Sequence, residues 1–246
     1  MLYGANTAVL DFDNFAQIET MLDKAVTDLG CYVFVNFINP IRHEAMKTYA
    51  YEIFSELGRV PDFSFHPMGT GGGVWGTWKG YNELAAMGVT DKVPHMVPVQ
   101  PEAVCWLKRA VDSGAEVAEM YGDSTRTIAQ SISGNSPLQG GRRLIRAVRE
   151  SGGAAVAVSD DEILAAMVDL GHEGIGAEPS SASTEAAFKQ AVKAGKISSS
   201  DTVVCVITGT AFKQPSVVEH IAALPKYTIR ADVDQLKGLL VRLKLL

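Results

Sequence analysis

Short apolar runs alternate with longer amphipathic stretches along most of the chain, and this alternation constrains the fold more than any other feature. The apolar runs have the length of buried strands and cover residues 32–35, 63–66, 96–100, 154–158 and 203–207. The amphipathic stretches have helical length and cover residues 14–29, 42–57, 74–88, 137–150, 159–172, 183–195 and 235–246. This order predicts a three-layer α/β fold, with a mostly parallel sheet and helices on both faces. We interpret residues 1–246 as a single α/β unit.

Several helix boundaries are marked by the residue types that cap helices. Ser159 stands three residues before Glu162 and ahead of an apolar run, which is typical of a capping box. Ser183 precedes the next amphipathic stretch in a similar way, and Pro40 suits the first position of a helix. The expected stop signals are Gly58 with Pro61, the pair Gly152 and Gly153, and Gly171.

The overall charge is not that of a nucleic-acid-binding protein. A net charge of −6 argues against a phosphate-binding surface, which usually needs a basic patch. Four arginines recur at helical spacing, and we interpret them as a solvated helix face rather than as a nucleic-acid site. They are Arg142, Arg143, Arg146 and Arg149.

The remaining composition excludes several other classes of protein. No run approaches the roughly 20 apolar residues that span a bilayer, and the amino terminus has no signal-peptide pattern. Three scattered cysteines are too few for a disulfide framework, and the dispersed histidines show no metal-ligand spacing. We therefore expect a cytoplasmic protein without a metal site and without a membrane partner.

The segment 65–76, Phe-His-Pro-Met-Gly-Thr-Gly-Gly-Gly-Val-Trp-Gly, is the strongest functional signal. An apolar strand ends at Pro67, four glycines follow within five positions, and a helix is expected to begin near Val74. Glycines let a phosphate approach the backbone, and a helix amino terminus adds its dipole. The segment matches neither a Walker loop nor a GxGxxG dinucleotide motif. Its position between strand and helix favours a phosphate cradle over a flexible linker.

Three other segments place polar side chains where ligands or helix caps are found. Thr208 follows an apolar strand, which is equally consistent with a ligand contact and with a turn that bonds its own backbone. Arg42 falls in the first turn of a helix, where it either binds an anion or only supports the helix start, and His43 beside it is expected at the surface. The segment 178–182 puts hydroxyls at a helix start, as caps or as ligand contacts.

Taken in order, these segments resemble the threonine-synthase branch of the fold-type II pyridoxal-phosphate (PLP) enzymes, in the tryptophan synthase beta superfamily. The similarity covers nearly the whole chain, and the ordered combination is more specific than any single motif. The matching runs are 39–42 with 47–48, 69–76 with 78–81, 127–129, 147–153, 178–182, and 208–209 with Lys213 and Pro215.

The resemblance implies where the cofactor, pyridoxal 5'-phosphate, is held. In the family a threonine matching Thr208 bonds the pyridine nitrogen, and a neutral hydroxyl there leaves the ring unprotonated. That electronic setting suits elimination and replacement at the β- and γ-carbons of amino acids. The family's glycine loop binds the cofactor phosphate, and it maps onto Gly69, Thr70, Gly71, Gly72 and Gly73.

The resemblance also implies a substrate, an amino-acid phosphate ester. The arginine matching Arg42 helps to bind that phosphate in threonine synthases, and we expect Asn39 and Arg42 to bind substrate. The expected reaction converts O-phosphohomoserine to threonine plus phosphate, in threonine biosynthesis. Phe37 replaces a frequent serine, and Thr70 with glycines replaces frequent asparagines. A relative that acts on another amino acid, of the deaminase or cysteate/cysteine synthase type, is therefore the alternative.

A further implication concerns the Schiff-base lysine. In the family this lysine and the Ser/Thr-Gly-Asn loop precede the position that Met1 matches, and Lys47, Lys79 and Lys213 fall where no cofactor is bound. We therefore assign no catalytic residue and expect the large PLP-binding domain with part of the small domain. The prediction is a PLP-dependent carbon–oxygen lyase, incomplete alone and completed by a separate amino-terminal chain, and a homodimer is expected by analogy with the family. The alternative is a non-catalytic remnant or regulatory partner that binds PLP or another phosphate ligand.

Overall fold

The computed structural model describes residues 3–11, 15–30, 39–122, 126–221 and 227–246, and the run expected at 32–35 lies outside them. In this part of the chain four strands form one parallel sheet in the order β3-β2-β1-β4. All four coincide with expected apolar runs. The strands are β1 (Phe63–Pro67), β2 (His95–Pro101), β3 (Val156–Val158) and β4 (Val203–Cys205).

The helices confirm the expected alternation and add two elements that the sequence pattern did not predict, α5 and α9. The ten α-helices of the described residues are α1 (Phe15–Leu29), α2 (Pro40–Met46), α3 (Thr48–Leu57), α4 (Gly72–Ala86), α5 (Trp106–Asp112), α6 (Arg142–Glu150), α7 (Asp160–His172), α8 (Pro179–Lys193), α9 (Pro215–Ile221) and α10 (Val233–Arg242).

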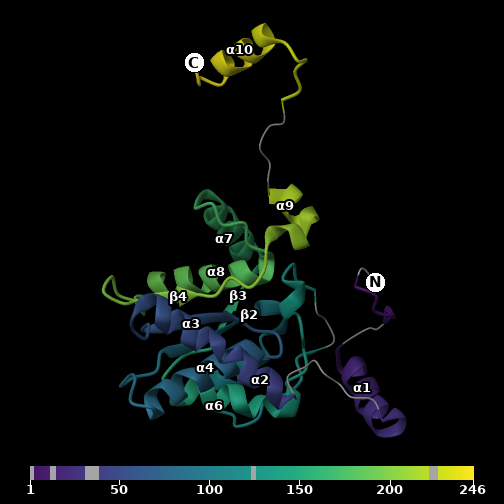
Figure 1. The fold of residues 1–246 in the computed structure, drawn as a ribbon, viewed down its shortest axis with the longest axis vertical. Helices are drawn as coiled ribbons and strands as arrows, with labels where there is room; N and C mark the ends of the chain where they lie inside the picture. Colours follow the sequence, from purple (N-terminus) through teal and green to yellow (C-terminus); the bar gives the residue numbers. More distant parts are fainter. Residues whose placement is uncertain (1–2, 12–14, 31–38, 123–125, 222–226) are drawn as a thin grey trace.

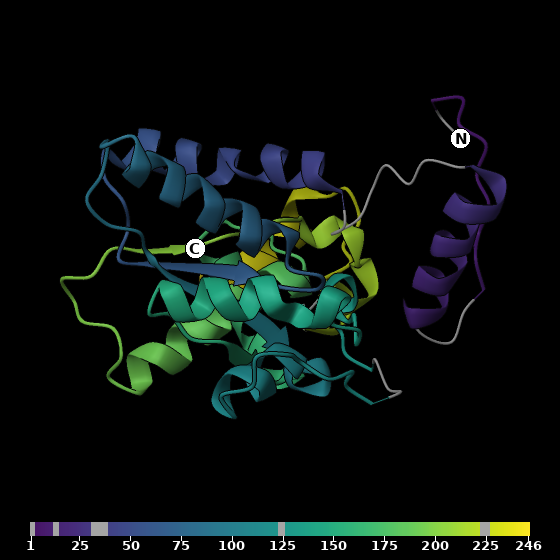
Figure 2. The same cartoon turned by 90° about the horizontal axis from the view of Figure 1, so that it is seen from below.

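Helices cover both faces of the sheet, as the three-layer prediction requires. Helices α4 and α6 pack on one face, and α8 packs against the strands on the other face (Figure 1). Beyond these layers α3 packs on α4 and α7 packs on α8. Helix α1 stands apart from the packed layers in both views (Figures 1 and 2), and α10 stands apart in Figure 1. The single-unit interpretation of residues 1–246 therefore stays a prediction.

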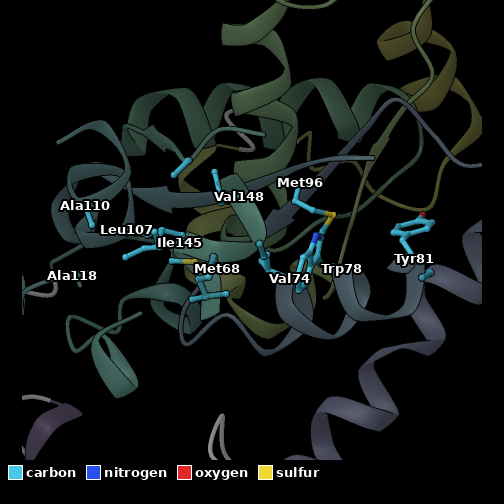
Figure 3. Packing of buried hydrophobic residues seen from close by; sticks show 14 of the residues in the cluster. Met68, Val74, Trp78, Tyr81, Met96, Leu107, Ala110, Ala118, Ile145 and Val148 are labelled. Carbon is cyan, nitrogen blue, oxygen red and sulfur yellow. The ribbon is translucent and has the colours of Figure 1, made fainter. Parts of the chain in front are cut away.

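The helices that cover the two faces of the sheet bury residues of different size. The α4 and α6 side buries large residues, among them Trp78, Tyr81, Met96 and Ile145, which Figure 3 shows around these helices. The α8 side is built on small residues of that helix, such as Ala182, Ala186 and Ala187, packed against strand residues. Small residues on α8 let the helix lie close to the strands and to the loops that leave them.

Several boundaries differ from the sequence predictions. Helix α8 begins at Pro179 rather than at Ser183, which is buried inside the helix and donates to the Ser180 carbonyl. The stretch 42–57 is divided at Lys47, although that residue keeps helical backbone angles. His43 is buried, with a 4% exposed fraction, because α2 packs on α4, so its expected surface position was wrong. The capping box of Ser159 and Glu162 is confirmed.

Candidate functional site

A cavity of about 370 Å³ lies where β1 and β4 end, at the carboxyl edge of the parallel sheet. That edge is where open α/β sheets place their ligands. The cavity brings together most of the residues that the sequence analysis singled out. Its lining residues are Arg42, Met46, Tyr49, Pro67, Gly69, Thr70, Gly71, Gly72, Gly73, Ser131, Ile132, Gly134, Ser136, Glu178, Thr208 and Lys213.

The glycine loop forms one wall and leads directly into α4. Gly71 has φ +84°, in the left-handed region that favours glycine, and α4 starts at Gly72 without a side-chain cap. The first N–H groups of a helix have no partner within the helix, so they are free to bind an anion. A Cβ built on Gly73 would meet nothing within 4 Å, so the backbone is open to a ligand there. The geometry fits a phosphate group.

A second wall is formed by the loop after β4, which is fastened to the start of α8. The Ser181 side chain, with an exposed fraction of 0%, bonds the backbone N–H groups of Thr208 and Gly209 at 3.0 and 2.8 Å. Its Oγ also lies 3.0 Å from Thr208 Oγ1. The Thr208 hydroxyl is thus bonded to another element rather than turned onto its own backbone. Thr208 lines the cavity, as the ligand-contact interpretation requires.

The cavity lining includes positive side chains from two segments of the chain. Arg42 comes from the first turn of α2, and Lys213 from the turn after β4, where its Nζ lies 4.0 Å from the buried Glu178 carboxylate. Asn39 is not among the lining residues, because its side chain accepts a hydrogen bond from the Ile41 backbone and caps α2. Its predicted substrate contact therefore stays a prediction.

Two other lysines that the sequence analysis weighed lie in an ion-pair cluster outside the cavity lining. Lys47 Nζ is 2.7 Å from Glu83 and Lys79 Nζ is 2.6 Å from the same carboxylate, and both also pair with Glu44. Hydrogen bonds from the two lysines and from Tyr51 lower the pKa of Glu83 to about 2. This cluster ties α2 and α3 to α4, which carries the glycine loop.

A buried histidine lies directly behind the cavity wall. The His66 ring makes an edge contact with Tyr49, a lining residue, and its Nε2 lies 3.0 Å from Ser64 Oγ. Burial lowers the pKa of His66 from its ordinary value of 6.5 to about 4, because desolvation disfavours the charged ring. His66 is therefore neutral at physiological pH and is part of the packing beneath the site.

Sequence reasoning missed the lining residues that come from the loop 121–136. Ser131 and Ser136 line the cavity, and Ser131 Oγ donates to Ser180 Oγ at 2.7 Å. The serine-rich composition of this segment indicated a connection and gave no sign of which turn would face the site. The one sequence signal in this segment was the run 127–129, which matches the family. In the structure the Thr127 hydroxyl and the Ile128 N–H donate to the Asp160 carboxylate.

Two further classes of site do not occur in the part of the chain that the structure describes. There, no three His, Cys, Asp or Glu side chains are grouped so that they could hold a metal ion. None of the helices in these segments is both long enough and apolar enough to cross a bilayer.

Comparison with known proteins places this geometry in a family. A family model described as pyridoxal-phosphate dependent enzyme matches residues 1–209. Threonine synthase of Methanosarcina acetivorans is 38% identical over 205 residues, which are 82% of this chain and 50% of that protein. Threonine synthase of Methanocaldococcus jannaschii is 33% identical over 99% of this chain and 59% of its own length. The chain thus spans about half the length of the curated relatives it matches.

Solved structures with the same fold are more distant in sequence. A threonine deaminase from T.th. superposes with a TM-score of 0.62 at 21% identity, over 78% of this chain and 61% of that chain. The processed form of threonine deaminase isoform 2 from Solanum lycopersicum gives a TM-score of 0.66 at 21% identity, over 88% and 60% of the two chains. These likenesses show a fold-type II architecture. The family match, with the threonine synthase relatives, shows that this chain belongs to the pyridoxal-phosphate dependent enzymes.

Proposed function

We propose that the chain forms the phosphate-binding and ring-binding walls of the PLP site of a threonine-synthase-like lyase, which converts O-phosphohomoserine to threonine and phosphate. One observation carries the proposal: the glycine loop, Thr208 and Arg42 are distant in sequence and line one cavity. The cavity volume of about 370 Å³ is in the range of small-molecule sites. Similarity to threonine synthases over 82% and 99% of the chain supports the reaction class.

The residues present suit the cofactor's two ends. The uncapped N–H groups at the start of α4 and the backbone of Gly69–Gly73 would hold the phosphate. The Thr208 hydroxyl on the opposite wall would meet the ring nitrogen. When bound, PLP supplies an electron sink for elimination and replacement at amino-acid carbons. The protein's part is to fix the ring between the two walls and to keep the nitrogen contact neutral.

The substrate would enter past the positive side chains at the mouth. Arg42 presents a guanidinium whose fork matches a phosphate ester, and Lys213 adds a second cation on the other side. Glu178 lies 4.0 Å from Lys213 Nζ and offsets part of its charge, so Arg42 carries most of the preference for an anion. An amino-acid phosphate ester fits this positive side chain better than an uncharged amino-acid side chain does. A cytoplasmic setting and a homodimer belong to the same proposal through the family resemblance.

The proposal is tested by titrating the purified chain with PLP and following absorbance and protein fluorescence. We expect saturable binding that inorganic phosphate competes away and that Gly71→Ala weakens at least tenfold. Gly171→Ala is the matched control, because a Cβ there meets nothing within 4 Å and the residue does not line the cavity. Absence of binding at millimolar PLP would overturn the proposal.

Turnover needs a separate measurement. The chain is mixed with an amino-terminal segment of a related threonine synthase, and phosphate release from O-phosphohomoserine is followed. Phosphate release that depends on PLP and on both polypeptides supports the lyase. PLP binding without turnover in the mixture would favour the non-catalytic binding module.

A further inference from the structure

The Ser181 hydroxyl stands at the centre of a small, closed set of hydrogen bonds behind the ring-binding wall. It is fully buried in the first turn of α8. Two backbone N–H groups, those of Thr208 and Gly209, point at its oxygen from 3.0 and 2.8 Å. The remaining polar neighbours are Thr208 Oγ1 at 3.0 Å, the Gly209 carbonyl at 3.4 Å and Glu178 Oε1 at 3.5 Å.

Counting donors and lone pairs fixes the direction of these bonds. A serine hydroxyl has one proton and two lone pairs, and the two backbone N–H groups use both lone pairs. The Ser181 proton must therefore be donated. Hydroxyl hydrogen bonds to oxygen span about 2.5–3.0 Å, and Thr208 Oγ1 is the neighbour within that range. Ser181 therefore donates to Thr208.

The reverse arrangement is disfavoured. If Thr208 donated to Ser181, the serine oxygen would accept three hydrogen bonds with two lone pairs. Its own proton would then be left with acceptors at 3.4 and 3.5 Å in a buried position. A buried donor without a good acceptor costs about 1–3 kcal/mol.

The Thr208 proton is consequently left without an acceptor in the protein, and Thr208 lines the cavity. No second hydrogen-bond partner for Thr208 Oγ1 occurs in residues 39–122, 126–221 or the other described segments. We propose that Ser181 is a positioning residue that makes Thr208 a hydrogen-bond donor toward the cavity, so that the ligand atom at this point must be an acceptor. The identity of this ligand atom rests on the proposed function, under which it is the unprotonated ring nitrogen of PLP.

The test compares two probes on the full chain. One is PLP, and the other is its 1-deaza analogue, in which a C–H replaces the ring nitrogen and cannot accept a hydrogen bond. The wild-type chain is expected to bind PLP about fivefold to tenfold more tightly than the analogue. A ratio of this size corresponds to the net contribution of one hydrogen bond. Ser181→Ala is expected to bind the two probes within about twofold of each other, because Thr208 Oγ1 is no longer held by a donor. A purely structural defect would weaken both probes equally and leave their ratio unchanged.

Ser183→Ala is the matched control. It removes a hydroxyl that is equally buried in the same helix and that bonds the Ser180 carbonyl instead of the cavity wall. The control is expected to keep the wild-type ratio between the two probes. If Ser181→Ala does not fold, Ser181→Cys keeps the buried volume with a weaker donor and is expected to reduce the ratio to about twofold.

The outcomes separate this inference from the proposed function. A wild-type ratio that persists in Ser181→Ala, or in Ser181→Cys when only that variant folds, overturns the positioning role and leaves the proposed function intact. Equal binding of both probes by the wild type overturns the Thr208 contact and the inference with it, while the phosphate cradle stands. Failure of the wild type to bind PLP at millimolar concentration overturns the proposed function.

Discussion

The two ends of the same strands form cavities of opposite character. At the carboxyl edge, the 370 Å³ cavity is lined by glycine backbone, hydroxyls and charged side chains. At the amino edge, a cavity of about 510 Å³ is lined mainly by apolar groups, including Phe63, Val97 and Ala187, with His95 at its side. Strand β1 borders both cavities, with Pro67 at one end and Phe63 at the other, so the difference comes from the segments around the strand ends. The carboxyl edge presents the uncapped start of α4.

The amino edge, by contrast, is closed by backbone contacts. Gly153 lies so close to β2 that an added Cβ would overlap the Met96 carbonyl. The Ser151 hydroxyl donates to the Val148 carbonyl and accepts from the Met96 N–H, and the Ser151 carbonyl lies 2.8 Å from His95 Nδ1. Backbone groups are satisfied there within the protein. At the carboxyl edge the start of α4 has no side-chain cap, and this contrast favours that edge as the candidate binding site.

The largest expected effect is at the amino edge. Gly153→Ala should lower the free energy of unfolding by about 4 kcal/mol or more, since the methyl group collides with backbone that cannot rotate away. Denaturant-induced unfolding measures this loss. Gly171→Ala, an open helical position, should be neutral or stabilising by up to about 1 kcal/mol. Equal stability of Gly153→Ala and wild type would show that the amino edge is not closed by backbone contact.

The next effect is a pH dependence that originates beneath the carboxyl edge. The folded-state pKa of His66 is about 4 and its ordinary value is 6.5, so on acidification the unfolded chain takes up the proton first. The stability contribution of His66 is complete above pH 6.5 and falls by about 3 kcal/mol as the pH drops to 4. Unfolding free energies at several pH values, for wild type and His66→Gln, measure it. An identical slope in both proteins would contradict the assignment.

The third effect comes from Gly71→Ala in the glycine loop, which is expected to change stability less than the two preceding perturbations and to weaken ligand binding strongly. Gly71→Ala forces an alanine to φ +84° and pushes on the Leu144 side chain, at a cost of about 2 kcal/mol. Phosphate and PLP affinity should fall at least tenfold, because the N–H groups of the loop turn away. Calorimetric titration with inorganic phosphate checks this. Unchanged phosphate affinity in a folded Gly71→Ala protein would remove the cradle from the site.

The smallest effect is expected at the ion-pair cluster, which touches neither cavity. Glu83→Gln removes a carboxylate that two lysines and Tyr51 share, and half-buried pairs that keep contact with solvent contribute about 1 kcal/mol. The loss should shrink as salt is added, since the Glu83 and Lys79 side chains remain partly exposed. Thermal unfolding at low and high ionic strength measures it. A change in PLP affinity in this variant would connect the cluster to the site after all.

The sequence predicted the architecture of the sheet well because its signals are local. Strands β1 to β4 are short apolar runs, and the capping box at Ser159 is a four-residue pattern. The prediction that α8 begins at Ser183 was wrong. A serine within a helix can donate to a carbonyl one turn back, as Ser183 does, and the sequence does not distinguish such a serine from a helix cap. Helices α5 and α9 have seven residues each, too few to show a helical period.

The candidate site was predictable where one segment carries the chemistry. The glycine loop is recognisable from its composition and its position between a strand and a helix. The roles of Thr208 and Arg42 were inferred from the family resemblance. The segment 178–182 was expected to supply caps or ligand contacts, and the structure places Glu178 in the cavity lining and Ser181 behind it. Ser131 lines the cavity only because the chain returns to this edge, and no sequence spacing indicates that return. Asn39 was expected to bind substrate, whereas in the structure its side chain caps α2 and does not line the cavity.

The close approach of Gly209 to Glu178 has an evolutionary consequence. A Cβ at position 209 would occupy the space of the Glu178 carboxylate, and the Glu178 N–H also bonds the Gly209 carbonyl at 3.0 Å. A larger residue at position 209 therefore requires the Glu178 side chain to move or to be shortened, so the residue types that fit at one position depend on the residue at the other.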